Sequence, residues 1–285
     1  MKRLVLVAVV LAACKTNKPP PPAAPTDVVV LAPGAAPQKP VRYAVPKGTK
    51  STIEVATDWK VTADDMATTL PTIVTTFEVA CDDVAPDGTM KLHAKVLDAT
   101  AHERADSKVN PASIASELEP LKGTTLAMNL TPDGRAAQAT VVPGEKPLTP
   151  QVTEQMNALA ASFSQLAMSL PAAPIGPGAK WQTSRKITQG GLALTTVTTV
   201  DVTAIDASGI AFTLASEIHG ADQTVTQNGL SVEMKDVSGT ARGKGTIELT
   251  KGIMTGDLHF DLKSKMSAAA GSATQMHVET DLAIH

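Results

Sequence analysis

Aromatic residues are scarce in this sequence, which contains one tyrosine, two tryptophans and four phenylalanines among 285 residues. Ligand pockets and protein interfaces are usually richer in aromatic side chains. A sugar-binding site, which usually stacks sugar rings on tryptophan or tyrosine, is therefore disfavoured. An aliphatic cavity that holds acyl chains is not disfavoured by this composition.

The sequence also lacks a convincing arrangement of histidines. His93, His259 and His277 fall on the polar positions of predicted strands, where a solvated, charged sheet face accounts for them. If the last two strands form a hairpin, His259 and His277 share one face with Asp261 and Glu279, but a zinc site needs three or four converging ligands. We predict no metal site, no cofactor and no catalytic residue.

Three further features resemble chemical motifs without matching them. Residues 102–106 read His-Glu-Arg-Ala-Asp, which has aspartate where the metalloprotease motif HExxH has its second histidine. Residues 239–245 do not have the spacing of a phosphate-binding loop. Cys81 alternates with Phe77 and Val79, which indicates a small buried hydrophobic residue and not a nucleophile.

The first fourteen residues have the pattern of an export signal. Met1, Lys2 and Arg3 are followed by an unbroken apolar run, residues 4–13, and then by Cys14. The run has about ten residues, whereas a membrane-spanning helix needs roughly 20. A charged start and a short apolar run predict a signal peptide over residues 1–13.

The end of this run, Leu11-Ala12-Ala13-Cys14, resembles the lipobox of bacterial lipoproteins. The resemblance implies cleavage before Cys14 and attachment of acyl chains to that cysteine. It also implies a membrane as partner through the lipid anchor. Lys15 replaces the aspartate that retains such proteins in the inner membrane of enteric bacteria, which favours the outer membrane, facing the periplasm. The alternative is an ordinary signal peptide with a chance cysteine.

Charge and cysteine count suit an exported domain. Without Lys2 and Arg3, 23 basic residues face 28 acidic residues, a net charge of −5. A nucleic-acid partner is disfavoured, since it requires a clustered basic face. If Cys14 is lipidated, Cys81 has no partner within the chain, so the fold must be held by its core and not by a disulfide.

Residues 14–45 are predicted to be a disordered tether. They are rich in proline and alanine, including four consecutive prolines at positions 19–22, and such a stretch favours extended polyproline II. The apolar patch Val28–Leu31 interrupts this composition. The sequence leaves open whether that patch docks on the domain as an edge strand.

The remaining chain contains an internal echo. Residues 74–79, Val-Thr-Thr-Phe-Glu-Val, match residues 197–202, Val-Thr-Thr-Val-Asp-Val. Upstream, residues 48–50 and 178–180 each begin with glycine and end with lysine, and each opens a segment with a tryptophan, Trp59 or Trp181. We predict two related β-rich halves, 46–148 and 171–285. The alternative is a chance likeness between Thr- and Val-rich strands.

Period-two alternation dominates both halves and predicts antiparallel sheet that is wet on one face. For example, Leu258, Phe260 and Leu262 alternate with charged residues and a histidine. Asn110-Pro111 predicts the start of a short helix that ends before Pro120. The predicted fold class is mainly β, with two related halves of curved antiparallel sheet and one amphipathic helix packed on it.

That amphipathic helix is predicted over residues 149–170, from a Thr149 cap and Pro150. Its apolar residues recur every three or four positions and form one stripe. Candidate ligand-lining residues on this stripe are Val152, Met156, Leu159, Phe163 and Leu166. The alternative is that the stripe belongs to the core.

The join between the halves, residues 170–181, resembles the LPxxPxxxGxxW linker of uncharacterised bacterial lipoprotein families. The likeness extends over about residues 150–285, and those families have no assigned catalytic residues to carry over. More loosely, a lipid-anchored antiparallel sheet with a helix on it is similar in architecture to the half-barrel lipoprotein carriers, which hold acyl chains between sheet and helix. Fold alone does not fix function.

These features favour a cell-envelope lipoprotein with a non-enzymatic binding or scaffolding role. Its sharper version is a hydrophobic or lipid ligand held between helix and sheet. One alternative is an envelope hydrolase that uses Asp or His on the polar face. Another is a protein-interaction module that binds an envelope protein through an exposed sheet edge.

Overall fold

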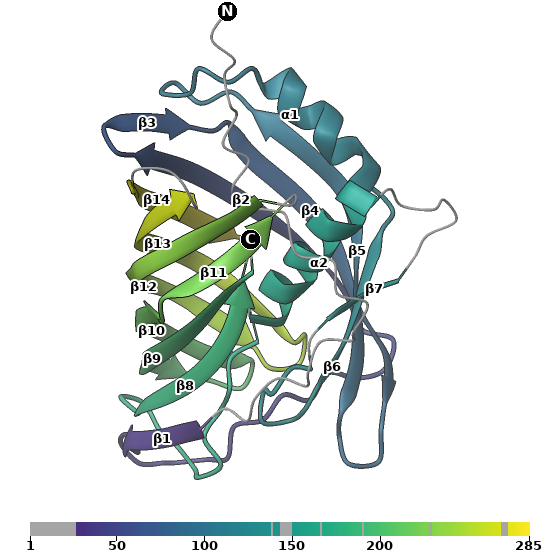
Figure 1. Ribbon diagram of the computed structural model, residues 1–285. Coiled ribbons are helices and arrows are strands. Elements are labelled where there is room, and N and C mark those ends of the chain that lie inside the picture. The colour runs from purple at the N-terminus through teal and green to yellow at the C-terminus, as the bar shows by residue number, and fades with distance from the viewer. Residues whose placement is uncertain are drawn as a thin grey trace, which may run out of the picture.

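The computed structural model describes residues 27–137, 139–142, 150–165, 167–189, 191–227, 230–268 and 273–285 (Figure 1). Within these ranges the chain is mainly β, which confirms the predicted fold class. The helices are α1 (Pro111–Leu118), the short 3-10 helix η1 (Glu119–Leu121) and α2 (Pro150–Gln165). The strands are β1 (Asp27–Ala32), β2 (Lys50–Ala63), β3 (Met66–Thr69), β4 (Thr72–Val84), β5 (Met90–His102), β6 (Thr125–Leu130), β7 (Thr140–Val142), β8 (Lys180–Gln189), β9 (Leu192–Ile205), β10 (Gly209–Gly220), β11 (Gln223–Gln227), β12 (Leu230–Glu248), β13 (Ile253–Ala268) and β14 (Thr274–Ile284).

The strands form one antiparallel sheet that does not close on itself. Its order is β1-β8-β9-β10-β12-β13-β14-β2-β4-β5-β6-β7, with β3 beside β2 and β11 beside β12. Strands β2–β7 belong to the first half of the chain and strands β8–β14 to the second. The last strand, β14, pairs with β2 and joins the halves into one sheet that curves around α2 (Figure 1). Neither α-helix in the described ranges has the length and apolarity that crossing a membrane requires.

The two halves begin with the same hydrogen-bond pattern. The backbone N–H of Gly48 donates to the carbonyl of Cys81 (2.8 Å), and the N–H of Gly178 donates to the carbonyl of Val202 (3.0 Å). Cys81 and Val202 donate back to the residue that follows each glycine. Both glycines have a positive φ, a backbone conformation that residues other than glycine rarely adopt. This shared geometry relates β2 and β4 of the first half to β8 and β9 of the second.

The structure corrects one detail of the repeat. The sequence echo aligns Val79 with Val202, but the hydrogen bonds match Cys81 to Val202, a shift of two residues. A two-residue shift keeps every side chain on the same face, so the alternation alone could not detect it. Trp59 and Trp181 also differ in place, because Trp181 follows Lys180 directly whereas Trp59 lies nine residues after Lys50.

The C-terminal part of the predicted tether is folded, which corrects its boundary at residue 45. Residues 27–32 form β1 and pair with β8, so the patch Val28–Leu31 is an edge strand. Val41, Tyr43 and Val45 are buried in the core. Proline content suggested an unfolded spacer, but these three residues alternate with polar or small ones, as in a strand with one buried face. Residues 14–26 lie outside the described ranges.

The sheet has an inner face toward α2 and an outer face toward solvent. A large group of buried residues, here called the main core, lies between the inner face, α2 and residues 41–45. It includes Phe77 and Val79 of β4 and Trp181 of β8. α2 contacts β7 and β8, which lie near opposite ends of the sheet order, so the helix spans the gap between them (Figure 1).

The glycine-rich segment 239–245 is the middle of β12 and alternates small inner residues with polar outer ones. A Cβ on Gly243 would lie 2.3 Å from a methyl carbon of Leu258, and one on Gly245 would lie 2.2 Å from the carbonyl oxygen of Thr255. The glycines therefore permit a close approach of β13. This packing role accounts for a motif that resembles a phosphate-binding loop only in composition.

Candidate functional site

The helix stripe packs as core in this structure. Met156 is fully buried, and Phe163 is buried with its ring centroid 6.1 Å from that of Phe77 on β4. Leu159 is half-buried against the same core. Val152 lies in α2, but its side chain is outside the described residues, as are Leu166 and Cys14. Three of the five predicted ligand-lining residues thus face the sheet, and they fill the space there.

The helix ends earlier than predicted. Its described part runs from Pro150 to Gln165, and residues 167–170 are not helical. Leu170 is buried, and its N–H donates to the carbonyl of Asp133 (2.8 Å). The next residue is Pro171, and a residue before proline is disfavoured in α-helical conformation. Leu170 fits the three- and four-residue spacing of the stripe, but it is buried through this separate contact and not as part of the helix.

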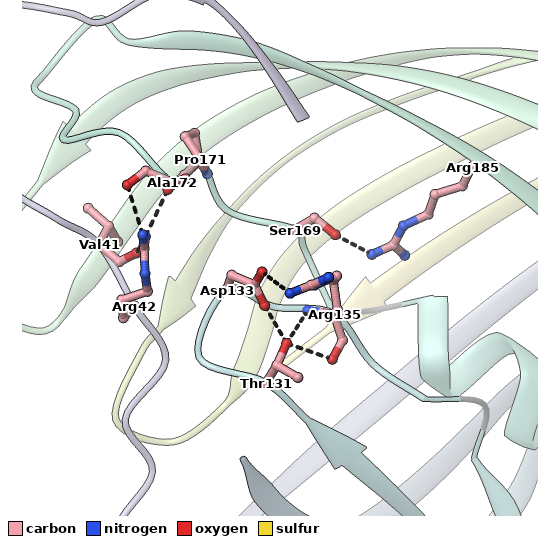
Figure 2. A network of polar contacts seen from close by, with 9 residues as sticks. All are labelled: Val41, Arg42, Thr131, Asp133, Arg135, Ser169, Pro171, Ala172 and Arg185. Carbon is pink, nitrogen blue, oxygen red and sulfur yellow. Dashed lines mark hydrogen bonds and ion pairs between the residues drawn. The ribbon is translucent and has the colours of Figure 1, made fainter. Parts of the chain in front are cut away.

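The segment after α2, residues 167–172, is held by side chains from distant parts of the chain (Figure 2). The guanidinium of Arg42 donates to the carbonyls of Pro171 and Ala172, each at 2.8 Å. The turn that presents Asp133 is closed by contacts of its carboxylate with Thr131 and Arg135. These contacts hold residues 167–172 in place against the first half of the chain.

Arg185 of β8 is an inner-face cation that sequence reasoning missed. It donates to the carbonyl of Ala167 (3.1 Å). It also donates to the hydroxyl of Ser169 (2.8 Å), as Figure 2 shows. Burial lowers the pKa of its guanidinium from the usual value, while the nearby Tyr43 hydroxyl acts in the opposite direction. In the alternation of β8, Arg185 falls on the same face as Trp181. This pattern could have predicted from the sequence that Arg185 lies on the inner face.

Trp181 and Tyr43 complete this buried region. Trp181 is fully buried, and its indole N–H donates to the carbonyl of Ser169 (3.1 Å). Burial raises the pKa of the Tyr43 hydroxyl, and a hydrogen bond with the backbone of Met168 and the charge of Arg185 oppose the shift only in part. The polar groups around residues 167–172 therefore serve to position this segment.

A second hydrophobic group on the inner face differs from the main core. It is called here the second cluster, and every member belongs to a strand between β8 and β13. Its buried members are Leu194, Ile218, Met234, Val237 and Ala241, and its half-buried members are Ile187, Leu192, Val225, Val232, Phe260, Leu262 and Met266. No helical residue is among these described members. The half-buried members therefore keep part of their apolar surface in contact with solvent.

A polar row separates the two hydrophobic regions on the inner face. In register across β8, β9 and β10 lie Thr183, Thr198 and Ser216, and the hydroxyls of Thr198 and Ser216 are 2.7 Å apart. Arg185 lies in the next row, opposite Thr196. The inner face is thus apolar at both ends and polar between them.

The histidines lie on the outer face, as their alternation predicted. His259 contacts Asp281 at 2.7 Å, and His277 contacts Asp261 at 2.9 Å across the β13–β14 hairpin. On the first half, His93 contacts Asp82 at 2.8 Å. Within the described part of the chain, no three His, Cys, Asp or Glu side chains are placed to hold a metal ion.

A shallow hollow of about 550 Å³ lies on this outer face and includes His259 and Asp281. Its other charged lining residues are Asp58, Arg242, Lys244 and Asp257. The described residues that line it contain no serine, threonine or cysteine next to the His259–Asp281 pair. Among the described lining residues, a serine, threonine or cysteine nucleophile is therefore not paired with His259 there.

Cys81 is a buried, free cysteine of the main core. Burial raises the pKa of its thiol, and the backbone of Asp83 opposes that shift. Because the thiolate is the nucleophilic form, this environment suits a structural cysteine.

The fold defines a mainly β protein with an open antiparallel sheet and a helix on its inner face. A family of unknown function, DUF6263, matches residues 151–254 of this chain, which include α2, the linker and β8 to β12. No curated protein matches the chain.

Proposed function

We propose that this protein is a lipid-anchored protein of the bacterial cell envelope with a non-enzymatic role, and that it binds a hydrophobic ligand on the second cluster. The observation that supports this proposal is the set of half-buried apolar side chains on strands β8 to β13, to which no described helix residue contributes. Contiguous apolar surface that stays in contact with solvent often marks a binding site, and the half-buried members of the second cluster keep part of their surface in such contact. The proposal moves the ligand site away from the α2 stripe, because that stripe already packs against the sheet.

The chemistry of the second cluster suits an acyl chain. Its members are aliphatic apart from Phe260 and the two methionines, Met234 and Met266, whose flexible side chains adapt to irregular ligands. Covering such a surface contributes about 0.8 kcal/mol for each buried methylene group. The polar row with Thr198 and Ser216 lies at one end of the cluster, where the polar end of such a ligand would find hydroxyl groups.

A fluorescent fatty acid tests the ligand site in solution. We expect saturable binding to the full chain and at least about a tenfold weaker affinity for Leu262→Gln, since a polar amide on the cluster must be desolvated. Leu97→Gln is the matched control, because Leu97 is a half-exposed leucine outside both hydrophobic regions. Equal affinity of Leu262→Gln and Leu97→Gln would place the ligand elsewhere. Absence of any saturable binding, with no lipid found in native mass spectra of the purified protein, would contradict a hydrophobic ligand.

The anchor is tested separately. Cells that express the full chain are fed a clickable palmitate analogue, and their envelopes are fractionated. We expect labelling and membrane association that Cys14→Ala abolishes, and recovery with the outer membrane. Labelling that persists in Cys14→Ala would contradict the lipobox assignment without bearing on the ligand site.

A further inference from the structure

We propose that the edge strand β1 is a self-association interface, at which a second copy of this chain pairs antiparallel with β1 and extends the sheet. This inference does not depend on the ligand. It starts from the two ends of the sheet order, β1 and β7. A strand at a sheet edge presents unpaired N–H and C=O groups that can bind another strand.

The two edges differ in how well they are protected. Within the described residues, strand β7 comprises three, Thr140–Val142, and a very short edge strand is one of the usual protections against pairing. Strand β1 has six residues, Asp27–Ala32, and contains neither proline nor lysine. Asp27, at its first position, is its only charged residue, so residues 28–32 carry none of the charges that usually prevent pairing.

The side chains of β1 reinforce this contrast. Val29 is 55% exposed and Leu31 is 52% exposed, so two branched aliphatic side chains face solvent on one short strand. Val28 is half-buried against the main core, which holds the strand on the sheet. The register with β8 is regular from Asp27 to Val30 and shifts only between Val30 and Ala32. The regular part therefore offers an uninterrupted ladder of backbone groups to a partner strand.

The edge is also held in place before any partner arrives. Just after β1, the carbonyl of Pro33 accepts from the N–H of Gly176 (2.9 Å), and the N–H of Ala35 donates to the carbonyl of Pro177 (2.8 Å). A preformed binding surface loses little conformational entropy on association. β1 is thus a fixed strand, bonded on one side to β8.

A second copy is the occupant that these properties favour. Antiparallel pairing of two identical strands has twofold symmetry and closes at a dimer, the commonest form of protein oligomer. Asp27 is the only charged residue of β1 and lies at one end of it, so antiparallel pairing places the two aspartates toward opposite ends of the ladder. One strand pair with contacts at Val29 and Leu31 is a small interface, so we expect a weak dimer.

Cysteine scanning in the native envelope tests the symmetric pairing. In a twofold antiparallel pair, one residue lies opposite its own copy with Cα atoms about 4.5–5.5 Å apart, which is within reach of a disulfide. We introduce Val28→Cys, Val29→Cys or Val30→Cys one at a time into the full chain and apply a mild oxidant. We expect one position to give at least about ten times more disulfide-linked dimer than Met66→Cys, the control at a residue that is 75% exposed on β3.

A charged edge provides the second test. Val29→Lys with Leu31→Lys, measured by sedimentation of the detergent-solubilised protein, should remove the dimer while the thermal melting curve stays unchanged. A cross-linked adduct with another protein, or no scanned position above Met66→Cys, would overturn pairing with a second copy. A wild-type protein that sediments as a monomer at all concentrations and gives no cross-link would do the same.

Discussion

The main core and the second cluster lie on the same face of one sheet but differ in what covers them. The main core is sealed by α2 and by residues 41–45, which bring Met156, Phe163 and Tyr43 onto the sheet. The second cluster consists of strand residues and stays half-open. Both arise from the same alternation of apolar and polar residues. Alternation thus determines which face is apolar, whereas the covering elements determine whether that face becomes interior or surface.

We expect the main core and the second cluster to have different roles. A sealed core contributes stability through complete burial, so its substitutions should mainly affect the free energy of unfolding. A half-open cluster contributes less stability for each residue and offers surface to a ligand. Four substitutions or conditions test this division, in order of decreasing expected effect.

The largest effect is expected from the main core. Trp181→Ala should lower the free energy of unfolding by about 3–5 kcal/mol, since it leaves a cavity at a fully buried site. Urea denaturation measures this loss. Trp181→Phe is the control that keeps most of the volume but loses the hydrogen bond to Ser169, so it should cost less. Similar small losses for both variants would show that this region is not sealed.

The turn that supports the segment after α2 should come next. Gly134 has a φ of +80°, and an added Cβ would lie 2.0 Å from the carbonyl oxygen of Met168. Gly134→Ala should therefore lower the free energy of unfolding by about 2–3 kcal/mol. The matched control is Gly123→Ala, which has the same φ and nothing within 4 Å of the added Cβ, so that only backbone strain of about 1 kcal/mol is expected. Equal losses of stability in the two variants would mean that residues 167–172 move aside for the added methyl group at little cost in free energy.

Alkaline pH should weaken the main core through Tyr43. Burial raises the pKa of this tyrosine in the folded protein, while the unfolded chain titrates near 10.0. A raised folded-state pKa means that the contribution to stability is complete below pH 10 and is lost as pH rises above 10. The loss should be about 1.4 kcal/mol per pH unit.

The chain has a single tyrosine, so absorbance of tyrosinate at 295 nm reports Tyr43 alone. We expect that absorbance to rise only together with unfolding. Urea titrations at pH 9 to 11 should show a steeper decline for the wild-type protein than for Tyr43→Phe. Ionisation at pH 10 in a protein that is still folded would place Tyr43 in contact with water.

The smallest effect is expected from the second cluster. Leu262 is half-buried, so Leu262→Ala should cost about 1 kcal/mol, well below the 2–5 kcal/mol of a fully buried leucine. Leu126→Ala, at a fully buried leucine of the main core, is the comparison. If Leu262→Ala costs as much as Leu126→Ala, the second cluster is covered and the division between the two regions fails.

Sequence reasoning predicted the elements better than their boundaries. Strands on the alternating segments, helix α2 and the outer-face position of the histidines followed from periodicity, and helix α1 followed from the cap and proline at Asn110-Pro111. The helix end at Gln165 and the folded segment 27–45 did not, because both depend on partners far away in the chain, such as Asp133 for Leu170 and β8 for β1. The candidate site moved for the same reason, since the α2 stripe meets Phe77 only through the tertiary fold.

By itself, the sequence determined the fold class and which residues form the apolar face and the polar face of the sheet. It also determined that, if Cys14 is lipidated, the chain has no disulfide between its two cysteines. These properties depend on local alternation and on composition. Only the tertiary structure decided which apolar residues are covered, because a side chain is buried by elements distant in sequence. It also decided that β14 pairs with β2 and that β1 ends the sheet, since strand neighbours are set by the path of the whole chain.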